Sequence, residues 1–478
     1  MLYYFLDWLN ELYDIPGFGV FRFITFRAIL SIIFSLIISL LIGKKIIDLL
    51  RKNLIGEVVR DSDTGPDHAA KAGTPTMGGV IIIAAIVIPT LLWADIKNSY
   101  VWLILLGTVW MGAIGFVDDY IKVFKKDKAG LKGKFKIVGQ VGLGIVVGLV
   151  MLNHPDFMGS RANLTQLNVI KTNKLLTDVG FRPGDVLVKI NGVAYEEAPD
   201  GENYIDIGTY TVMRDFHDLA GNLMNTEFEV DIPAINRKLV ASELFGPKDE
   251  SFIYITDFPF FKSFVFDYSK VPILQNFIEP KILGRVVYLL VVIFIITFVS
   301  NAVNLTDGID GLASSVTAIV GAGLGLFAYV SGNFVFSTYL NISYIPLSAE
   351  LLVYSTALIG GCLGFLWYNA YPAQVFMGDT GSLALGGALG ILALMVKKEL
   401  LIPILCGIFI AEAVSVIIQV SYFKYTKKRT GEGKRVFLMA PLHHHYEKKG
   451  LHEAKIVARF LIVAVLLVLV AFATLKLR

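Results

Sequence analysis

Residues 300–312 read SNAVNLTDGIDGL and lie between two long apolar runs, at 284 to 303 and 312 to 331. Amides and carboxylates beside hydrocarbon are costly unless they line a wet cavity or hold a cation. Glycine lets the backbone turn tightly and approach a ligand, while oxygen-bearing side chains suit Mg²⁺ or a polyhydroxylated substrate. The stretch therefore predicts a functional site at a membrane boundary; the alternative is an ordinary turn between two helices.

The chain of 478 residues is too apolar for a soluble protein, since 55% of its residues are hydrophobic and the mean hydropathy is +0.64. Crossing the hydrocarbon takes about 20 apolar residues. We therefore predict an all-α polytopic membrane protein with about ten transmembrane helices, of which the fourth and eighth are short. The predicted spans are 22–43, 77–96, 100–117, 137–152, 284–303, 312–331, 350–368, 380–396, 400–423 and 456–475.

The first twenty residues carry three acidic residues and no basic start, so they do not read as a signal peptide. Their Tyr, Phe and Trp content favours an interfacial amphipathic helix. Cys362 and Cys406 both fall within predicted spans. We expect them to be packing residues rather than a disulfide or metal pair.

The segment 153–283 interrupts the membrane pattern and separates a first membrane part, 1–152, from a second, 284–478. It holds 19 of the 40 acidic residues and 12 of the 43 basic ones. Alternating polar and apolar residues predict a β-rich domain. Residues 179–193 resemble the G-x-x-P-G-D-x-I-x-x-I-N-G stretch of bacterial PDZ domains, including an Asn-Gly hairpin turn. Residues 214–224 are expected to supply the PDZ helix, but no glycine-rich carboxylate-binding loop precedes them, which argues against peptide capture.

The basic residues outside this insert concentrate in the loops 44–76, 118–136 and 424–455. Such loops face the cytoplasm by the positive-inside rule. An even number of spans separates successive polar loops, so 304–311 and 369–379 emerge on the same side. The motif-bearing loops therefore meet at the cytoplasmic face, and we expect the insert and both termini to be extracytoplasmic.

Adjacent carboxylates, Asp118 and Asp119, end the third predicted span. The helix dipole disfavours negative charge at that end. A bound Mg²⁺ or the lysines that follow must compensate; a solvated charge pair is the alternative. The candidate lysines are Lys122, Lys125, Lys126, Lys132, Lys134 and Lys136.

Asp379 belongs to the stretch FMGDTGS, residues 376–382, just before the eighth span. A helix that begins near Thr380 offers free N–H groups to an anion. A carboxylate beside such a turn suits Mg²⁺-phosphate, and a simple helix cap is the alternative. The stretch KAGTPTMGG, residues 71–79, opens the second span, and its lysine and threonine groups suit a diphosphate.

The stretch MAPLHHHYE, residues 439–447, lies between the last two spans. Three consecutive histidines cannot all face one ion in a regular element, so zinc ligation is not expected. We expect phosphate contact or orientation of a carboxylate instead. Glu412 lies within the ninth span, where a neutral carboxyl bonded to a neighbouring helix is the simplest interpretation, and we place it outside the site.

Together, GTPTMGG, DDY, NAVNLTDGIDGLA, FMGDTGSLALGGALG and MAPLHHHYE resemble the motifs of the phospho-N-acetylmuramoyl-pentapeptide-transferase family, in order and spacing. This family belongs to the polyprenyl-phosphate N-acetylhexosamine-1-phosphate transferases. The resemblance covers nearly everything outside 153–283, where the family has a short outer hairpin and helix. The three-histidine loop separates it from relatives that transfer N-acetylglucosamine 1-phosphate.

The resemblance implies that phospho-N-acetylmuramoyl-pentapeptide passes from UDP-N-acetylmuramoyl-pentapeptide to undecaprenyl phosphate, with release of UMP. This is the first membrane step of peptidoglycan synthesis, in the bacterial inner membrane, and Mg²⁺ is the implied cofactor. No nucleic acid is expected as a partner. A homodimer and an outer-face partner of the insert are left open.

The resemblance also implies residue roles. Asp379 and Asp307 match metal positions, Asp118 matches a base that takes the proton from the lipid phosphate, and Asp119 lies beside it. Whether an aspartate instead forms a covalent phospho-enzyme stays open. The implied substrate-binding residues are Lys71, Thr76, Lys134, Asn304, Asp307, Asp310, Asn369, His443, His444 and His445.

Three other classes are weighed against this one. A related UDP-N-acetylglucosamine 1-phosphate transferase differs in its donor. A transporter would hold its polar groups near the midplane in broken helices, whereas these cluster at one face. A PDZ-bearing membrane metalloprotease needs His-Glu-x-x-His, and the stretch 452–456, HEAKI, lacks the second histidine.

Overall fold

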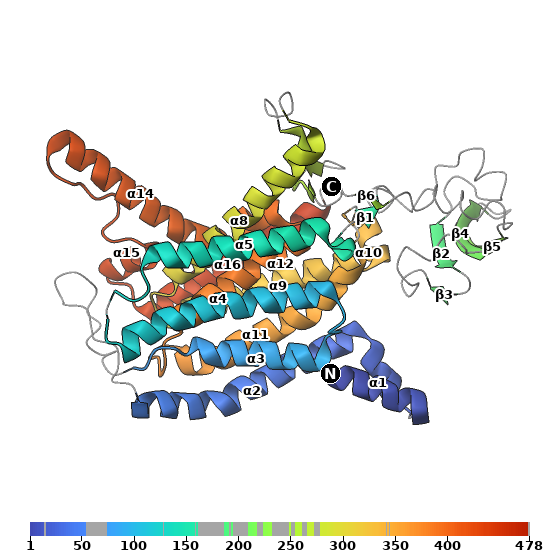
Figure 1. Ribbon diagram of the computed structural model, residues 1–478, viewed down its shortest axis with the longest axis horizontal. Coiled ribbons are helices and arrows are strands. Elements are labelled where there is room, and N and C mark those ends of the chain that lie inside the picture. The colour runs from blue at the N-terminus through green and yellow to red at the C-terminus, as the bar shows by residue number, and fades with distance from the viewer. Residues whose placement is uncertain are drawn as a thin grey trace.

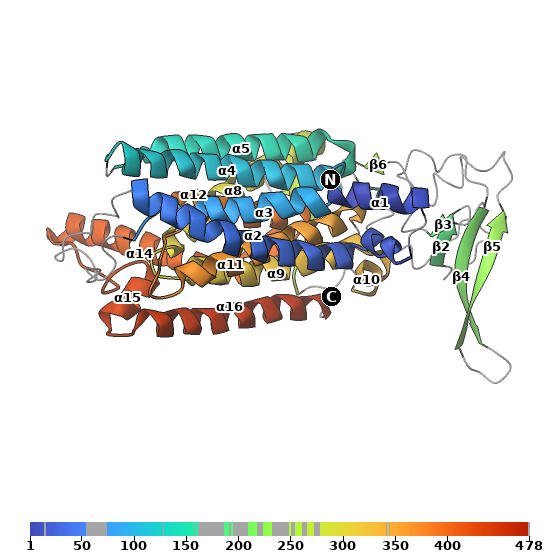
Figure 2. The ribbon, with the colours of Figure 1, turned by 90° about the horizontal axis from the view of Figure 1, so that it is seen from below.

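The computed structural model is dominated by long helices that lie side by side, with a small group of strands beyond one end (Figures 1 and 2). It describes residues 1–476 apart from 14–15, 54–73, 128, 158, 161–185, 191–192, 195–208, 218–222, 232–247, 250–253, 261–264, 272–277, 341 and 344. The described α-helices are α1 Leu2–Tyr13, α2 Ile24–Asn53, α3 Gly79–Trp93, α4 Ser99–Phe124, α5 Gly133–Asn153, α8 Pro280–Thr306, α9 Leu312–Gly332, α10 Phe334–Tyr339, α11 Leu351–Asn369, α12 Gly378–Met395, α13 Ile402–Leu405, α14 Gly407–Thr430, α15 Leu442–Lys448 and α16 Glu453–Lys476.

The helices confirm the predicted all-α polytopic class. Among the described residues, 9 helices are long and apolar enough to cross a membrane, and α3 is a shorter apolar helix. The prediction that the fourth span is short is wrong, because α5 has 21 residues. The second span, α3, is the shorter one, with 15 residues. Helix α5 begins at Gly133, four residues before the predicted start, so Lys134 and Lys136 both belong to its first turn.

The ninth predicted span, 400–423, is not one helix. It is divided at Cys406 between α13 and α14, and α14 continues to Thr430. In Figure 1, α14 runs out from the bundle beyond the ends of its neighbours. Cys406 and Cys362 are both buried free thiols, as expected of packing residues.

Helix α12 lies at the centre of the bundle. Every residue from Thr380 to Met395 is buried, and α3, α4, α8 and α9 pack around it. Glycines permit this close packing: a β-carbon at Gly386 would lie 2.6 Å from the Cα of Ser300 in α8. The first turn of α12, which carries Asp379, is therefore fixed by contacts on all sides.

The described strands of the insert are β1 Gly159–Ser160, β2 Val186–Ile190, β3 Val193–Ala194, β4 Thr209–His217, β5 Leu223–Asp231, β6 Lys248–Asp249, β7 Ile255–Asp257 and β8 Val265–Asp267. They form an antiparallel four-stranded sheet in the order β3-β2-β4-β5 and two small pairs, β1-β6 and β7-β8. Strands β2 and β3 pair as the predicted hairpin requires, while the Asn-Gly turn lies outside the described residues.

The expected helix at 214–224 is wrong. Residues 214–217 end β4 and residues 223–224 begin β5, and the two strands pair from Thr209↔Asp231 to His217↔Leu223. Tyr210, Val212 and Phe216 follow the two-residue period of a strand, which decides against a helix.

The β7–β8 hairpin packs on the end of the bundle that lies opposite the first turn of α12. The ammonium of Lys398 pairs with Asp257, and both side chains are buried. The hydroxyl of Tyr268 donates to Glu399 at 3.1 Å. Both ends of the chain lie at this same end of the bundle (Figures 1 and 2).

A second buried ion pair also lies at this end. The guanidinium of Arg27 pairs with Glu350 through two contacts, at 2.9 and 2.5 Å. This end of the molecule, with Arg27–Glu350 and Lys398–Asp257, is called the hairpin end below.

Candidate active site

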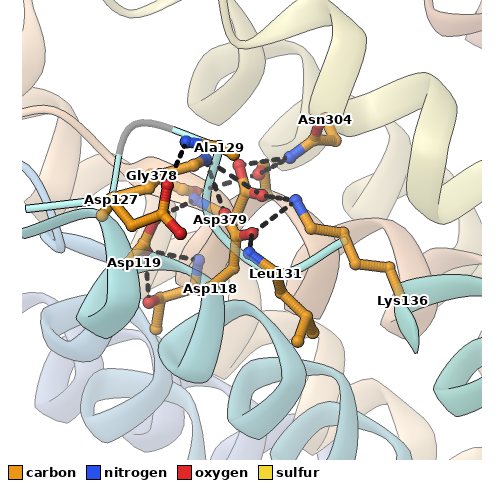
Figure 3. A network of polar contacts seen from close by, with 12 residues as sticks. Asp118, Asp119, Asp127, Ala129, Leu131, Lys136, Asn304, Gly378 and Asp379 are labelled. Atoms are coloured by element: carbon orange, nitrogen blue, oxygen red, sulfur yellow. Dashed lines mark hydrogen bonds and ion pairs between the residues drawn. The ribbon is translucent and has the colours of Figure 1, made fainter. Parts of the chain in front are cut away.

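Three carboxylates from two helices meet at the other end of the bundle. Asp118 and Asp119 come from α4, and Asp379 comes from the first turn of α12. One ligand atom from each lies within 4.8 Å of the others. Figure 3 shows the three side chains converging, with Lys136 and Asn304 beside them. Sequence reasoning predicted each of these acids, and the fold brings them together across 260 residues of chain.

Glycines allow the two helices to approach this closely. A β-carbon at Gly115, one turn before Asp119, would lie 2.1 Å from the carbonyl oxygen of Asp379. Gly378 has a φ of +72°, a left-handed conformation that favours glycine. A side chain at Gly378 would also collide with the Asp119 carboxylate, 2.6 Å from the β-carbon.

Asp119 binds the N-terminus of α12. Its carboxylate accepts hydrogen bonds from the backbone N–H of Asp379 at 3.1 Å, the N–H of Thr380 at 2.9 Å and the Thr380 hydroxyl at 2.6 Å. A helix N-terminus favours such an anion. The N–H groups that the sequence offered to a substrate anion are therefore already bound by a carboxylate of this chain.

Asp118 is fully buried and lies between two lysines. One oxygen accepts hydrogen bonds from the backbone N–H of Leu131 at 2.7 Å and pairs with Lys136 at 2.9 Å. The other lies 2.5 Å from the ammonium of Lys122, one turn along α4. Of the six candidate lysines, these two compensate the carboxylates.

The same two lysines reach Asp379. Lys136 pairs directly with its carboxylate, and the ammonium of Lys122 lies 3.5 Å from the same oxygen. Two ammonium groups thus face three carboxylates, which leaves the group one negative charge in excess when all are ionised. Lys134, the predicted phosphate partner, lies in the first turn of α5, where it is exposed.

Asn304 is the residue of the 300–312 stretch that reaches this group. Its side-chain amide donates to Asp379 at 3.0 Å and to the Ser382 hydroxyl at 2.9 Å. Asp307 instead follows the last residue of α8 and does not belong to the three-carboxylate group. Its predicted metal role stays a prediction.

Asp310 and Asn369 are buried and hold two loops together. Asp310 accepts a hydrogen bond from the N–H of Ala373 at 3.0 Å. Asn369 accepts from the N–H of Gly311 at 3.0 Å and donates to the carbonyl of Val375 at 2.9 Å. Together these contacts tie the turn between α8 and α9 to the end of α11 and the loop before α12.

Of the predicted residues in the 71–79 stretch, Thr76 is described and Lys71 lies outside the described residues. Thr76 lies close to the first turn of α12, since a β-carbon at Gly378 would lie 3.0 Å from its hydroxyl. The backbone N–H groups of Gly78 and Gly79 donate to the carbonyls of Phe376 and Met377, both at 2.8 Å. The loop that opens the second span is thereby joined to the Asp379 loop.

The three histidines lie in α15 and point to different partners, as their adjacency requires. His443 is fully buried, 3.2 Å from Glu412. His444 contacts Glu447 at 2.5 Å. His445 accepts a hydrogen bond from the N–H of Leu438 at 3.1 Å, and burial together with Lys449 lowers the pKa of His445.

Two contributors were not assigned from sequence alone. Lys136 was one of six candidates, and no spacing singled it out before the start of α5 was known. Glu412 is bonded to a neighbouring helix, as expected, and the structure identifies its partner as the first histidine of α15. The sequence feature that could have pointed to Glu412 is a carboxylate inside an apolar span.

A bundle of membrane-length helices with clustered carboxylates, lysines and an amide at one end defines a polytopic membrane protein with an acidic centre suited to a cation or a phosphorylated ligand. Comparison with known proteins identifies the family. The model of glycosyl transferase family 4 matches residues 256–397. Signature 1 of phospho-N-acetylmuramoyl-pentapeptide-transferase matches residues 71–83.

Similar proteins cover the full length. Relatives from Flavobacterium psychrophilum and Flavobacterium johnsoniae are 46% and 47% identical over 478 residues, and one from Amoebophilus asiaticus is 46% identical, each covering 100% of both chains. All three are named phospho-N-acetylmuramoyl-pentapeptide-transferase. This chain belongs to the phospho-N-acetylmuramoyl-pentapeptide-transferase family. Since the alignments run through 153–283, these relatives share the insert.

Proposed function

We propose that this transferase moves phospho-N-acetylmuramoyl-pentapeptide from UDP-N-acetylmuramoyl-pentapeptide to undecaprenyl phosphate. The products are undecaprenyl-diphospho-N-acetylmuramoyl-pentapeptide and UMP, so the reaction is the first membrane step of peptidoglycan synthesis. Full-length similarity to the named relatives supports the reaction. The observation that carries the chemistry is the Asp118–Lys136–Asp379 network at the end of α12.

The main obstacle to this reaction is repulsion between two anions. An oxygen of the lipid phosphate forms a bond to the sugar-linked phosphorus, and the bond from that phosphorus to the bridging oxygen breaks, so UMP leaves with that oxygen. Lys122 and Lys136 bring positive charge to the place where the phosphates must meet. Asp118 takes the proton of the lipid phosphate.

The donor set fits Mg²⁺. Carboxylate oxygens are the ligands that Mg²⁺ takes in proteins, usually one or two of them with substrate phosphates. Asp379 would hold the ion, because Asp119 already accepts three hydrogen bonds from α12 and Asp118 serves as the proton acceptor. When bound, the ion adds the positive charge that the group lacks and neutralises diphosphate oxygens. The substrate-binding roles of Asn304, Asp307 and the three histidines belong to this proposal.

In this proposal, the site end of the bundle lies at the cytoplasmic face of the bacterial inner membrane. The lysine- and arginine-rich segments 118–136 and 424–455 support this orientation. Both termini and the strands of the insert lie at the opposite end (Figure 2), which supports the proposal that 153–283 is a separate extracytoplasmic domain. The PDZ-like character of that domain, its outer-face partner and a homodimer belong to the proposal as well.

The test is UMP release by the purified protein with undecaprenyl phosphate and either UDP-N-acetylmuramoyl-pentapeptide or UDP-N-acetylglucosamine. We expect turnover with the first donor alone, abolished by EDTA and restored by Mg²⁺. Turnover with UDP-N-acetylglucosamine and none with the muramoyl donor would overturn the assignment. Activity that survives EDTA would overturn the cofactor.

A further inference from the structure

Glu412 is a carboxylate inside a membrane-length helix, and the reaction above gives it no role. It lies in the second turn of α14 and is fully buried. Its Oε1 accepts a hydrogen bond from the backbone N–H of His443 at 3.1 Å. Its Oε2 lies 3.2 Å from Nδ1 of the same residue, whose side chain is also fully buried. A buried acid in a membrane segment is costly and usually functional.

The opposite edge of the His443 ring lies against the turn between α8 and α9. A β-carbon at Gly308 would lie 2.2 Å from Nε2 and 2.9 Å from Cε1 of His443. The ring therefore fills the space that glycine leaves at this position. Within the described residues, neither ring nitrogen makes a hydrogen bond. The ring is therefore held by the nearby Glu412 carboxylate on one side and by packing against Gly308 on the other.

This turn leads directly to the carboxylate group. It follows α8, whose last turn carries Asn304, and Asn304 donates to Asp379 at 3.0 Å. The turn also carries Asp307 and Asp310, two of the residues that the family resemblance implies in substrate binding. A shift of the His443 ring would therefore move groups on the donor side of the site.

We propose that Glu412 is a positioning residue that acts through His443. It fixes the histidine ring, and the ring in turn fixes the 307–310 turn against which the UDP-linked donor binds. The inference rests on the proposed function, since it assigns a role within that donor site. Glu412 itself contacts neither the three carboxylates nor the lysines in the described structure.

The experiment uses the full-length protein and measures kcat, KM for each substrate and the melting temperature. Glu412→Gln keeps an acceptor for the backbone N–H but removes the charge. We expect KM for the UDP donor to rise about ten-fold, because the ring loses the carboxylate that lies 3.2 Å from its Nδ1, with kcat and KM for the lipid within about two-fold. Glu412→Asp should recover part of the loss.

The double variant Glu412→Gln/His443→Ala separates positioning from simple stabilisation. If Glu412 acts through His443, the double variant should match His443→Ala alone, because residues that act as one unit are not additive. Additive losses, or a lower melting temperature with unchanged KM, would overturn the proposal. If the wild-type protein shows no transfer from the UDP donor, the proposed function fails and this inference fails with it.

Two further variants complete the test. Gly308→Ala pushes the His443 ring from the other side, so it should raise KM for the UDP donor by the same route even if Glu412→Gln folds poorly. Glu350→Gln is the matched control, because Glu350 is a second buried glutamate, paired with Arg27 at the hairpin end. Glu350→Gln should lower the melting temperature and leave KM for the UDP donor unchanged. A rise in this KM as large as that caused by Glu412→Gln would overturn the proposal.

Discussion

The two ends of the bundle use the same kinds of side chain in different ways. At the hairpin end, Lys398 and Asp257 have side chains 0% and 5% exposed, and the charges are matched one to one. At the site end, Lys122, Lys136 and Asp379 are 36%, 20% and 15% exposed. Buried, matched pairs hold elements together, whereas partly exposed and unmatched charges remain able to bind something else.

Positive φ occurs at both ends of the bundle, since Lys397 at the hairpin end has a φ of 53°. At the site end, it brings glycines against the carboxylates. Gly378 and Gly130, both with positive φ, lie against the carboxylates of the site end, and a β-carbon at Gly130 would lie 2.7 Å from Asp118. Such positions cost stability and are kept where a backbone must approach a functional group. The exposure of the charges therefore fits a role in folding at the hairpin end and the proposed chemistry at the site end.

The largest expected effect is that of Asp379→Asn. The substitution keeps the size of the side chain and removes a carboxylate that both lysines face, so we expect Mg²⁺-dependent UMP release to fall at least about 10³-fold. The melting temperature should stay within a few degrees of the wild-type value. A large loss of stability with residual activity would show that the site end is structural too.

Asp118→Ala and Asp307→Ala extend this comparison. Asp118→Ala removes the proposed proton acceptor and should abolish release, while Asp307→Ala tests the second predicted metal residue, which the fold places outside the three-carboxylate group. If Asp307→Ala abolishes release and weakens Mn²⁺ binding, measured by electron paramagnetic resonance, Asp307 is a metal residue. If Mn²⁺ binding is unchanged, its role is donor binding.

The next effect in size is at the hairpin end. Lys398→Met should leave the buried Asp257 without its lysine and cost about 3–5 kcal/mol of stability. Thermal unfolding in detergent measures this loss, and kcat at a temperature well below the transition should be unchanged. The double variant Lys398→Met/Asp257→Leu should regain most of the stability. A loss of kcat in the folded single variant would contradict the division between the two ends.

The smallest effect is expected from the insert itself. Replacing residues 161–253 by a short linker keeps β7 and β8, which pack on the bundle, and removes strands β2 to β6. The rate of UMP release should stay within about two-fold of the wild-type rate, and the melting temperature within a few degrees. The reason is that the removed part lies at the end opposite the carboxylates. Loss of transfer in a well-folded deletion variant would show that the insert acts on the site.

The membrane helices and the three acids could be predicted from the sequence because each depends on local information. Apolar length sets the spans, and carboxylates beside glycines mark the loops. The choice of Lys136 over Lys134 could not be predicted, because it depends on where α5 starts. Side chains two residues apart on a helix point to different faces, so Lys136 turns toward Asp379 while Lys134 is exposed.

The link between Glu412 and His443 was missed for a related reason. Their contact joins α14 to α15, and a hydropathy pattern does not reveal how these two helices pack. The incorrect prediction of a helix at 214–224 arose in the opposite way, because local information was available and was not used. There the resemblance to PDZ domains was followed, although the local two-residue period already indicated strands.

The cap that Asp119 forms on α12 also has a consequence for biosynthesis. Asp119 and its partner Thr380 are 261 positions apart, with the whole insert between them. At about 5–20 residues per second, a ribosome needs tens of seconds to reach α12 after completing α4. During that interval Asp118 has a neutralising partner on its own helix, Lys122, four residues on, whereas Asp119 acquires its hydrogen bonds only when α12 arrives. The central helix therefore brings the three carboxylates together in a single late event of assembly, before the membrane-length helices α14 and α16 are made.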